Sequence, residues 1–471
     1  MPSVRELVLS LAALLLLASP TAAQAGSGNQ PLVLTNVTVI DVRGGPPRPG
    51  MSVVIGGGFI TRVAPGAPPA DQGQERRIDA SGKFLIPGLW DMHVHLTFGD
   101  WFPGAREITL PLFVANGVTG VRDMGSDLEP VLEWRKAIDA GTLLGPRIVT
   151  PGPMLDGPKP RFPSSLAIAT AEDGRRAVRQ LKQRGADFIK LQSLVPREAV
   201  FAIADEAKKQ GMVFVGHVPD AVRASEASNA GQQSFEHLIG VFEGSSPAED
   251  EFLTGAKGPG RFLATYDPDR AARLAALLAR NQTWQCPTLV WERGGNLIEE
   301  SDFAHDPLAK YAPASWKDKT WKRFTDQVTH EFNTDDLATR KRFVEKELEI
   351  VGVLHRAGVP FLAGTDTPPG VFVFPGFSLH EELQLLVRAG FTPLEALQAA
   401  TLNPAVFLGL EQRLGTVETG KVADLVLLDA NPLDDIRNTR KISAVLLRGR
   451  YLARADLDRV LAGVESAARN P

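Results

Sequence analysis

The sequence predicts an α/β fold: a (β/α)8 TIM barrel with a small β-sandwich domain built from both chain ends. Short apolar segments alternate with amphipathic stretches through the middle of the chain, as strands and helices do in barrel folds. Segments rich in β-branched residues flank this middle on both sides, and chain ends often lie close together. No glycine-rich G-x-G-x-x-G loop follows the first strand, which disfavours the alternative of an open doubly wound sheet.

Eight segments have the pattern of barrel strands. Each is short and apolar, and helical stretches such as Arg175–Arg184 and Arg197–Gln210 separate them. Eight such strands within about 320 residues suit a closed parallel barrel with insertions. The predicted strands are Gly88–Leu96, Val118–Asp123, Arg147–Thr150, Phe188–Leu191, Val213–Val218, Ser234–Leu238, Thr283–Leu289 and Pro360–Gly364.

The flanking segments set the expected domain boundaries. Turn-rich strand patterns occupy residues 26–87 and return in 413–471, so both are assigned to the small β domain, with a tail at the end. The barrel is expected over 88–412. Within it, 241–280 and 292–350 are long connections rich in charge, tryptophan and proline, which either shape the substrate pocket or form solvated helical decoration.

The segment 1–25 is typical of a signal peptide. An uncharged apolar run, Leu7–Ala18, follows Arg5 and precedes small residues with an A-x-A type cleavage site after Ala25. The run is short for a membrane span, and an uncleaved anchor is the alternative. We therefore expect a secreted or periplasmic protein with no stable membrane span after signal cleavage.

Composition narrows the class of protein. The net charge is -4, and the chain lacks the basic excess that nucleic-acid binding requires. Cys286 is the single cysteine, so no internal disulfide can form, and we expect this thiol to be a small buried residue on a strand. These features fit an enzyme with a small-molecule substrate and no nucleic-acid partner, and they leave a homo-oligomer open.

The strongest local signal is the segment Asp91-Met92-His93-Val94-His95 in the first predicted barrel strand. Side chains two residues apart on a strand point to the same face. His93 and His95 can therefore direct their rings at one metal ion. An H-x-H pair alone is moderately specific, but its position at the carboxyl end of a first barrel strand strengthens the prediction.

Four more polar residues end apolar strands. Lys190 follows Phe188-Ile189, His217 follows Val213–Gly216, His237 follows Ser234–Glu236, and Asp366 follows Phe361–Thr365. The carboxyl ends of barrel strands converge on one rim, where catalytic residues lie. Each residue alone could be structural, for example as a helix cap or a buried histidine. Together with the H-x-H pair they predict one metal site.

With these motifs, the sequence resembles the amidohydrolase superfamily, and most closely its branch of imidazolonepropionase-like proteins and Xaa-Pro dipeptidases. The resemblance covers nearly the whole chain after the leader, up to Leu452. The segments that carry it are Pro87–His95, Gly117–Asp123, Ile189–Leu191, Gly216–Pro219, Glu236-His237, Gly364–Thr367, Thr392–Ala405 and Gly415–Asp424.

The resemblance implies a centre with two metal ions. In the family the lysine carries a carboxylate added from carbon dioxide and bridges the two metals, and Lys190 occupies that position. A free ammonium would repel two cations, whereas a carbamate would neutralise them. By the same resemblance His93, His95 and Asp366 bind the first metal, and His217 and His237 bind the second. Imidazole and carboxylate ligands suit zinc, and manganese or iron is the alternative.

A mechanism follows from this centre. Hydroxide made available at neutral pH by the two metals attacks the scissile carbonyl. Asp366 is the expected catalytic residue, since it can take the proton of the attacking water and pass it to the leaving nitrogen. An amide leaves poorly as an anion, so the reaction needs this proton.

Other polar residues receive weaker interpretations. Arg122, near the end of the second strand, could pair with a substrate carboxylate or hold Asp123 or another acid. His380 opens a helix after the eighth strand, and a structural hydrogen bond is preferred to a role behind the metal ligands. The histidines expected to be non-catalytic are His305, His330 and His355.

The residues favour a binuclear hydrolase of amide bonds in small substrates such as Xaa-Pro dipeptides or N-acyl amino acids. One alternative is a hydrolase of another carbonyl bond, in a lactone, a cyclic amide or an amide-linked toxin. A deaminase fits less well, because by the resemblance such relatives use one metal and lack the bridging lysine. A different class is a secreted metal-binding protein without catalysis, which would not need a proton shuttle such as Asp366.

Overall fold

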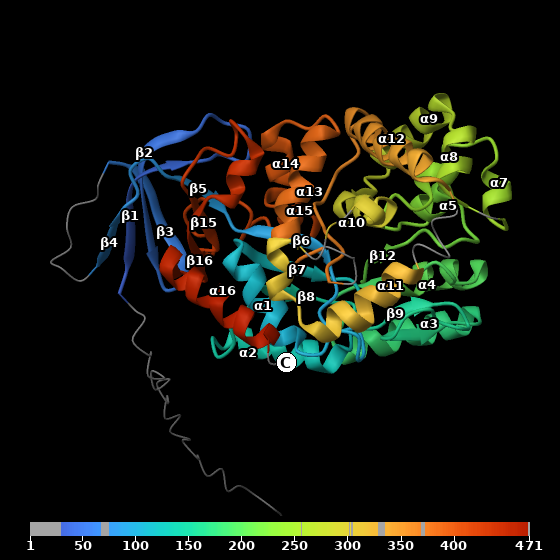
Figure 1. Cartoon of the computed structure of the whole chain (residues 1–471), viewed down its shortest axis with the longest axis horizontal. Coiled ribbons are helices and arrows are strands. Elements are labelled where there is room, and N and C mark those ends of the chain that lie inside the picture. The colour runs from blue at the N-terminus through green and yellow to red at the C-terminus, as the bar shows by residue number, and fades with distance from the viewer. Residues whose placement is uncertain are drawn as a thin grey trace, which may run out of the picture.

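The structure is a computed structural model that describes residues 30–66, 75–255, 257–300, 302, 305–327, 335–368 and 373–469. A β-sheet forms one end of the elongated molecule, and helices surround shorter strands in the remainder (Figure 1). The predicted signal peptide and His330 lie outside the described residues. Among the helices that are described, none is long and apolar enough to cross a membrane.

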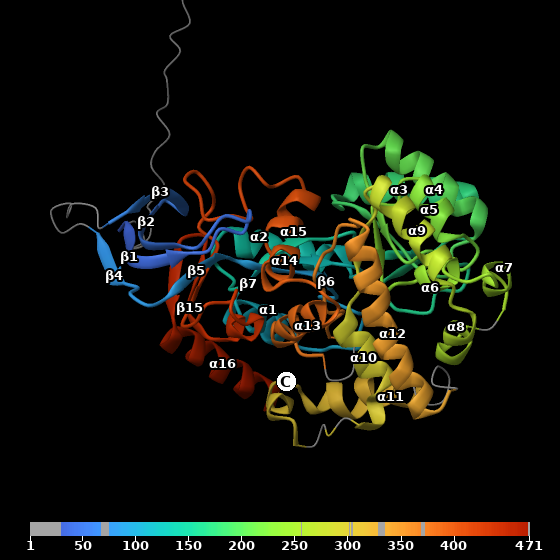
Figure 2. The same ribbon diagram turned by 90° about the horizontal axis from the view of Figure 1, so that it is seen from above.

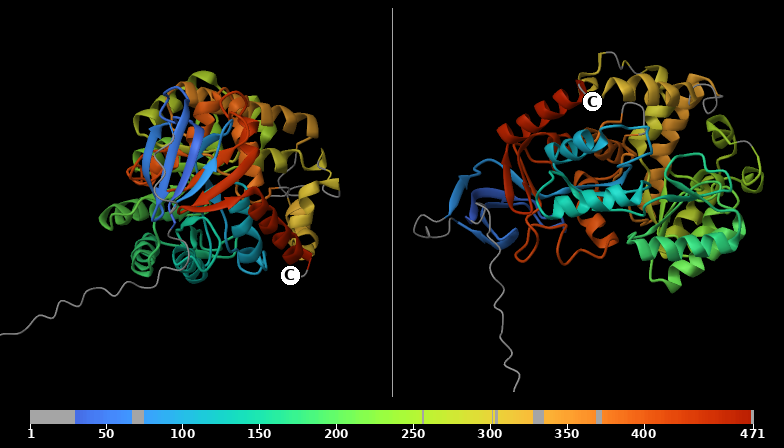
Figure 3. Two further views of the ribbon diagram at one scale, coloured as in Figure 1. Left: turned by 90° about the vertical axis from the view of Figure 1, so that its left-hand side faces the viewer. Right: turned by 90° about the horizontal axis from the view of Figure 1, so that it is seen from below.

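The sheet combines strands from both ends of the chain, as the sequence predicts. Strand β5 from the N-terminal part pairs antiparallel with β15 from the C-terminal part, with Leu425 opposite Pro87. The strand order is β17-β16-β15-β5-β1-β2-β3, and β4 pairs with β1 (Figure 3). The eight strands are hydrogen-bonded into one sheet. That this sheet folds into the two layers of a β-sandwich stays a prediction. The strands are β1 Leu32–Val39, β2 Arg48–Gly56, β3 Phe59–Pro65, β4 Arg76–Asp79, β5 Phe84–Pro87, β15 Leu425–Leu428, β16 Ile442–Leu447 and β17 Arg450–Ala453.

Apolar side chains from both ends of the chain form the core of this sheet. Leu34, Val53, Leu85, Leu427 and Leu446 are all buried in one cluster. Burial of apolar surface contributes about 25 cal/mol per Å². Since neither end can bury these side chains alone, packing holds the two ends together.

The middle of the chain contains parallel strands in two sheets. One has the order β6-β7-β8, and the other has the order β10-β9-β11-β12-β13-β14. Seven predicted strands are confirmed, six with shorter bounds and β7 with the same bounds, and β9 and β10 are additional. The strands are β6 Leu89–Val94, β7 Val118–Asp123, β8 Arg147–Val149, β9 Met154–Asp156, β10 Ser165–Ala167, β11 Ile189–Leu191, β12 Phe214–Gly216, β13 Ser234–Glu236 and β14 Trp284–Cys286.

The eighth predicted segment, Pro360–Gly364, is not a continuous strand. It joins the two sheets through isolated bridges, Gln285 with Phe361 and, just beyond the segment, Val94 with Thr367. The N–H of Leu362 donates to the carbonyl of Gln285 at 2.8 Å, and the N–H of Met92 donates to that of Ala363 at 2.9 Å. The segment therefore lies between β14 and β6, as an eighth strand would, but single bridges replace a ladder.

Helices surround the parallel strands (Figure 2). Local signals set their ends: in α3 the side chain of Thr170 accepts a hydrogen bond from the N–H of Asp173, and Gly185 ends the helix with φ 90°. The helices before the long connection are α1 Ala105–Ala115, α2 Leu128–Asp139, α3 Ala171–Arg184, α4 Arg197–Lys209 and α5 Ala224–Asn229. Those after it are α13 Phe377–Arg388, α14 Pro393–Ala399, α15 Leu402–Phe407 and α16 Arg454–Arg469.

The two long connections are largely helical. In space most of their helices lie toward the end of the molecule away from the β-sheet (Figures 1 and 2), whereas residues 307–311 contact α16. Several of their side chains line the cavity described below, which is one of the two interpretations that the sequence left open. Their helices are α6 Val241–Gly244, α7 Glu249–Phe252, α8 Pro259–Thr265, α9 Pro268–Arg280, α10 Leu289–Asn296, η1 Ile298–Glu300, η3 Pro307–Tyr311, η4 Trp316–Trp321, α11 Lys322–Gln327 and α12 Leu337–Arg356.

Candidate active site

The six predicted site residues line one cavity. They come from β6, β11, the residues just after β6, β12 and β13, and the residues just after Pro360–Gly364. The imidazole rings are close neighbours: centroids lie 4.6 Å apart for His93 and His237, 5.0 Å for His217 and His237, and 5.7 Å for His93 and His95. The structure thus brings together all the residues that the sequence proposed as ligands, which are His93, His95, Lys190, His217, His237 and Asp366.

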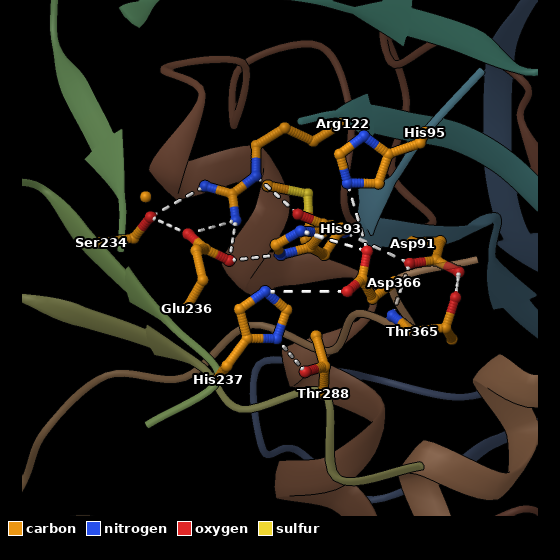
Figure 4. A network of polar contacts seen from close by, with 12 residues as sticks. Asp91, His93, His95, Arg122, Ser234, Glu236, His237, Thr288, Thr365 and Asp366 are labelled. Carbon is orange, nitrogen blue, oxygen red and sulfur yellow. Dashed lines mark hydrogen bonds and ion pairs between the residues drawn. The ribbon is translucent and has the colours of Figure 1, made fainter. Parts of the chain in front are cut away.

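Asp366 lies among three of these rings (Figure 4). Its Oδ1 is 3.2 Å from Nε2 of His95 and 3.6 Å from Nε2 of His93, and its Oδ2 is 3.8 Å from Nε2 of His237. The backbone of Asp366 has φ 56°, and that of His237 has φ 60°. Positive φ is uncommon for residues other than glycine, and such conformations gather at functional sites.

In three of the histidines, Nδ1 forms a hydrogen bond with a carbonyl or hydroxyl group, and each ring has its own partner. Nδ1 of His95 donates to the carbonyl of Gly125 at 2.7 Å. Nδ1 of His217 lies 2.8 Å from Oγ of Ser193, and Nδ1 of His237 lies 2.6 Å from Oγ1 of Thr288. These contacts orient each ring and leave its Nε2 for the centre, an arrangement typical of metal-binding histidines.

The fourth ring, His93, is held by a buried charged network. Its Nδ1 lies 2.9 Å from Oε2 of Glu236, and Nη2 of Arg122 donates to both oxygens of that carboxylate at 3.0 Å. Arg122 also donates from Nη1 to Oγ of Ser234 at 3.0 Å and from Nε to the carbonyl of Met92 at 2.6 Å. Arg122 and Glu236 are fully buried, so each compensates the other's charge in a medium of low polarity.

Burial favours the neutral form of three imidazoles of the site, those of His93, His217 and His237. It lowers the pKa of His93 and of His217 well below the usual value, with Lys190 as the next cause. It also lowers the pKa of His237 to about 3. Neutral imidazole is the form that binds metal ions. Burial likewise lowers the pKa of Lys190 to about 8, and only the uncharged amine can react with carbon dioxide.

Three buried polar atoms at the centre have no hydrogen-bond partner among the described residues: Nε2 of His93, Nζ of Lys190 and Oδ1 of Asp366. Leaving buried polar groups unpaired is costly, so such atoms require a ligand. Ligand atoms of His93, His95 and Asp366 lie within 4.8 Å of one another. A nitrogen and oxygen donor set of this kind fits a divalent metal such as zinc.

A second close group, of His93, Glu236 and Cys286, fits a metal less well. Both oxygens of Glu236 already accept from Arg122. Burial raises the pKa of the Cys286 thiol well above its usual value, so the thiolate that would bind a metal is disfavoured. Cys286 is a buried residue on β14, as the sequence predicts.

The centre forms one end of a cavity of about 350 Å³. One aromatic wall begins at His95, whose ring centroid is 5.0 Å from that of Phe98. The other begins at His237, whose ring centroid is 5.7 Å from that of Trp291. Outside the six site residues, the charged side chains of the lining are Arg161 and Glu292.

Some residues around the centre were missed as site residues. Glu236, Ser193 and Thr288 each contact a site histidine, and Glu292 lines the cavity. Burial, and next the charge of Asp366, raise the pKa of Glu292 to about 8. For Glu236 a signal existed: a carboxylate within an apolar strand, next to His237, needs a buried partner. No local pattern marks the other three.

The secondary candidates have structural contacts. Arg122 donates hydrogen bonds to Glu236 and not to Asp123. The carboxylate oxygens of Asp123 accept hydrogen bonds from the hydroxyl groups of Ser126 and Thr150. Nδ1 of His380 lies 2.9 Å from Oγ1 of Thr439, and its Nε2 lies 3.1 Å from the carbonyl oxygen of Asn116, which is the structural role that the sequence favoured.

The two remaining described histidines do not line the cavity. His305 is exposed, and its Nδ1 lies 2.7 Å from Oδ2 of Asp302. The ring of His355 stacks on that of Phe391 at 3.8 Å. These contacts agree with the prediction that neither residue is catalytic.

Comparison with known proteins establishes the class of this protein. The model of the amidohydrolase family matches residues 84–452, so the chain belongs to the amidohydrolase family. It is 27% identical over 418 residues to the ochratoxinase of Aspergillus niger, covering 77% of this chain and 73% of that protein. It is 27% identical over 387 residues to the imidazolonepropionase of Erwinia tasmaniensis, covering 80% and 85%.

A solved structure of a Xaa-Pro dipeptidase with bound methionine shares the fold, with a TM-score of 0.66 and 22% identity over 90% of this chain and 100% of that chain. The family resemblance that the sequence predicted is therefore confirmed, with neighbours of the imidazolonepropionase and prolidase types. This protein is a hydrolase acting on carbon–nitrogen bonds.

Proposed function

We propose that this protein is a hydrolase with two metal ions that cleaves amide bonds in small substrates such as Xaa-Pro dipeptides or N-acyl amino acids. One observation carries the proposal: Nε2 of His93, Nζ of Lys190 and Oδ1 of Asp366 are buried, have no hydrogen-bond partner among the described residues, and belong to side chains that line one ligand-sized cavity. Relatives named ochratoxinase and imidazolonepropionase support a hydrolytic reaction at a carbon–nitrogen bond.

The six site residues would hold the two metals, which we take to be zinc. His93, His95 and Asp366 would bind one ion, and His217 and His237 would bind the other. Two bound divalent ions would supply a nucleophilic hydroxide at neutral pH and polarise the scissile carbonyl. Lys190 would bridge them as a carbamate, formed when its uncharged amine attacks carbon dioxide and loses a proton. The lowered pKa of Lys190, about 8, favours that uncharged amine.

Proton transfer would fall to Asp366. Its carboxylate lies beside Nε2 of His95 and Nε2 of His93, so it is at the centre rather than behind it. From there it can accept the proton of the attacking water and donate it to the departing nitrogen. His93, His217 and His237 are poorly suited to this step, because burial lowers the pKa of each ring and disfavours its protonated form.

The remaining predictions belong to the same proposal. The strands around the centre would form a closed (β/α)8 barrel over 88–412, completed by Pro360–Gly364 between β14 and β6. Residues 26–87 and 413–471 would form the small β-sandwich domain. Residues 1–25 would be a cleaved signal peptide, so that the enzyme acts outside the cytoplasm.

The test is a substrate screen with the protein from Gly26 onward, loaded with zinc and bicarbonate. Dipeptides, N-acyl amino acids and lactones are assayed, and bound metal is measured by elemental analysis. We expect two metal ions per chain and hydrolysis of at least one amide class. Hydrolysis of lactones alone would support the alternative carbonyl hydrolase. Two bound metals without turnover of any substrate would favour a non-catalytic metal-binding protein.

A further inference from the structure

Asp366 is held in a different way from the four site histidines. Each of those rings has an Nδ1 partner behind it, whereas Oδ1 of Asp366 has no hydrogen-bond partner among the described residues. Its backbone is held instead: its N–H donates to the carbonyl of His93 at 2.7 Å, and the carbonyl of Thr367 accepts from the N–H of His95 at 2.8 Å. Asp366 has φ 56°, and such a conformation persists only where the surrounding contacts fix it.

One buried side chain from a remote segment contacts the chain just after Asp366. The indole N–H of Trp321 donates to the carbonyl of Pro368 at 3.0 Å. The ring centroid of Trp321 also lies 5.6 Å from that of Phe374. Trp321 therefore contacts this part of the chain twice, two residues and eight residues beyond Asp366.

The element that carries Trp321 is itself anchored. It is η4, a π-helix of six residues, and such turns frequently occur at functional sites. The indole N–H of Trp316 donates to the carbonyl of Pro103 at 2.9 Å, and the hydroxyl of Thr320 donates to that of Trp101 at 2.5 Å. Trp316 and Trp321 are both buried. Trp321 thus projects from an element that other hydrogen bonds fix in place, so it can fix the chain that it contacts.

The contacts of Trp321 lie outside the cavity lining. Neither Trp321 nor Pro368 nor Phe374 lines the cavity, whereas Asp366 does. Resting on the proposed function, we propose that Trp321 is a positioning residue that holds the carboxylate of Asp366 at the proposed metal centre. Its indole N–H fixes the carbonyl of Pro368 and so maintains the left-handed backbone of Asp366. The connection 292–350 thereby acts on the reacting centre as well as on the cavity wall.

Trp321→Phe tests this assignment, because phenylalanine keeps an apolar ring and removes the N–H. Loss of one hydrogen bond should lower kcat by about five- to tenfold. KM should stay within about twofold, because Trp321 does not line the cavity. The metal centre gives a readout that does not depend on turnover. Zinc affinity, measured by competition with a chelator, should decrease, and the visible absorption spectrum of the cobalt-substituted protein should change, because both depend on the geometry of the ligands.

Trp316→Phe is the matched control. It removes the same donor from the same π-helix, but its acceptor, Pro103, lies in another loop. Both variants should lose a similar amount of thermal stability. Trp316→Phe should keep the cobalt spectrum of the wild type, with kcat and zinc affinity within about twofold. A merely structural role of Trp321 predicts that the two variants behave alike, and that result would overturn the inference.

A second variant covers the case in which Trp321→Phe does not fold. Phe374→Leu removes the ring that Trp321 contacts on the far side of Pro368. It should lower kcat and zinc affinity and change the cobalt spectrum in the same direction as Trp321→Phe, by a smaller amount. A wild-type kcat together with a wild-type cobalt spectrum in this variant would count against the inference.

Hydrolysis and positioning can fail separately. If the wild type cleaves an amide and Trp321→Phe matches it in kcat, zinc affinity and cobalt spectrum, the proposed function stands and this inference falls. If Trp321→Phe weakens zinc binding and changes the cobalt spectrum, Trp316→Phe does neither, and the wild type cleaves no amide, Trp321 positions Asp366 and the proposed reaction falls.

Discussion

Oε2 of Glu236 lies 2.9 Å from Nδ1 of His93, and Arg122 holds the same carboxylate by two further contacts of 3.0 Å. The imidazole that faces the proposed metal is therefore oriented by a carboxylate, which is itself oriented by a guanidinium (Figure 4). A ring that donates from Nδ1 keeps its Nε2 lone pair free. The geometry of the centre thus depends on a layer of residues behind it.

Glu236→Gln should weaken metal binding. The amide NH2 of glutamine can take the position of Oε2, where it would donate to Nδ1 of His93 and force the proton onto Nε2. Loss of such an outer partner typically costs about ten- to a hundredfold in metal affinity. The affinity is measured by competition with a zinc chelator. The matched control is Glu206→Gln, a buried carboxylate on α4 away from the centre. Equal zinc affinity of Glu236→Gln and the wild type would contradict the assignment.

Asp366→Asn should nearly abolish turnover while the protein stays folded. The asparagine side chain cannot accept the proton of the attacking water, and loss of a general acid–base group costs about 10²- to 10⁴-fold in rate. The measurement is kcat with the best substrate from the screen, with melting temperature as the control for folding. Activity close to that of the wild type would refute the role of Asp366.

Lys190 should carry a carbamate when carbon dioxide is present. Protein exchanged into ¹³C-labelled bicarbonate should show a carbamate carbonyl resonance, and Lys190→Ala should lack it and bind fewer than two zinc ions. The lysine control is Lys257→Ala, because Lys257 already pairs with Asp220 and Glu243 outside the cavity. The resonance should persist in that variant. Its presence in Lys190→Ala would place the carbamate elsewhere.

His380 should contribute to a loss of stability at acid pH. Burial, and next the charge of Arg440, lower the pKa of His380 from its usual value of 6.5 to about 3. In the unfolded chain the His380 imidazole is protonated below about pH 6.5. In the folded chain it is protonated only below about pH 3. Stability from this group is therefore complete above pH 6.5 and falls as pH decreases toward 3.

The expected decrease between pH 7 and pH 5 is about 2 kcal/mol. Urea unfolding of the wild type and His380→Gln at both pH values measures it. His380→Gln loses the contact with Thr439 at both pH values. The quantity compared between the two proteins is therefore the change in the free energy of unfolding from pH 7 to pH 5. An identical pH dependence of the two proteins would show that His380 does not titrate in this way.

Much of the fold could be predicted because its signals are local. Val118–Asp123 follows the turn at Gly117 and contains two valines, and the structure has a strand with the predicted bounds. Pro360–Gly364 is also short and is also predicted as a strand, but it forms single bridges, since a ladder depends on register with both neighbours. Met154–Asp156 and Ser165–Ala167 are too short for periodicity to detect.

The sequence by itself determined which side chains gather at the centre. Alternation along β6 and the residue that follows it places His93 and His95 on one face, and parallel strands bring their carboxyl ends to one edge. Only the tertiary structure decided what lies behind and around them. That Arg122 holds Glu236 rather than Asp123, and that the rings of Phe98 and Phe162 lie together in the cavity lining, depends on distances between segments remote in the chain. Periodicity encodes the direction of a side chain within its own strand or helix, and packing alone selects its partner.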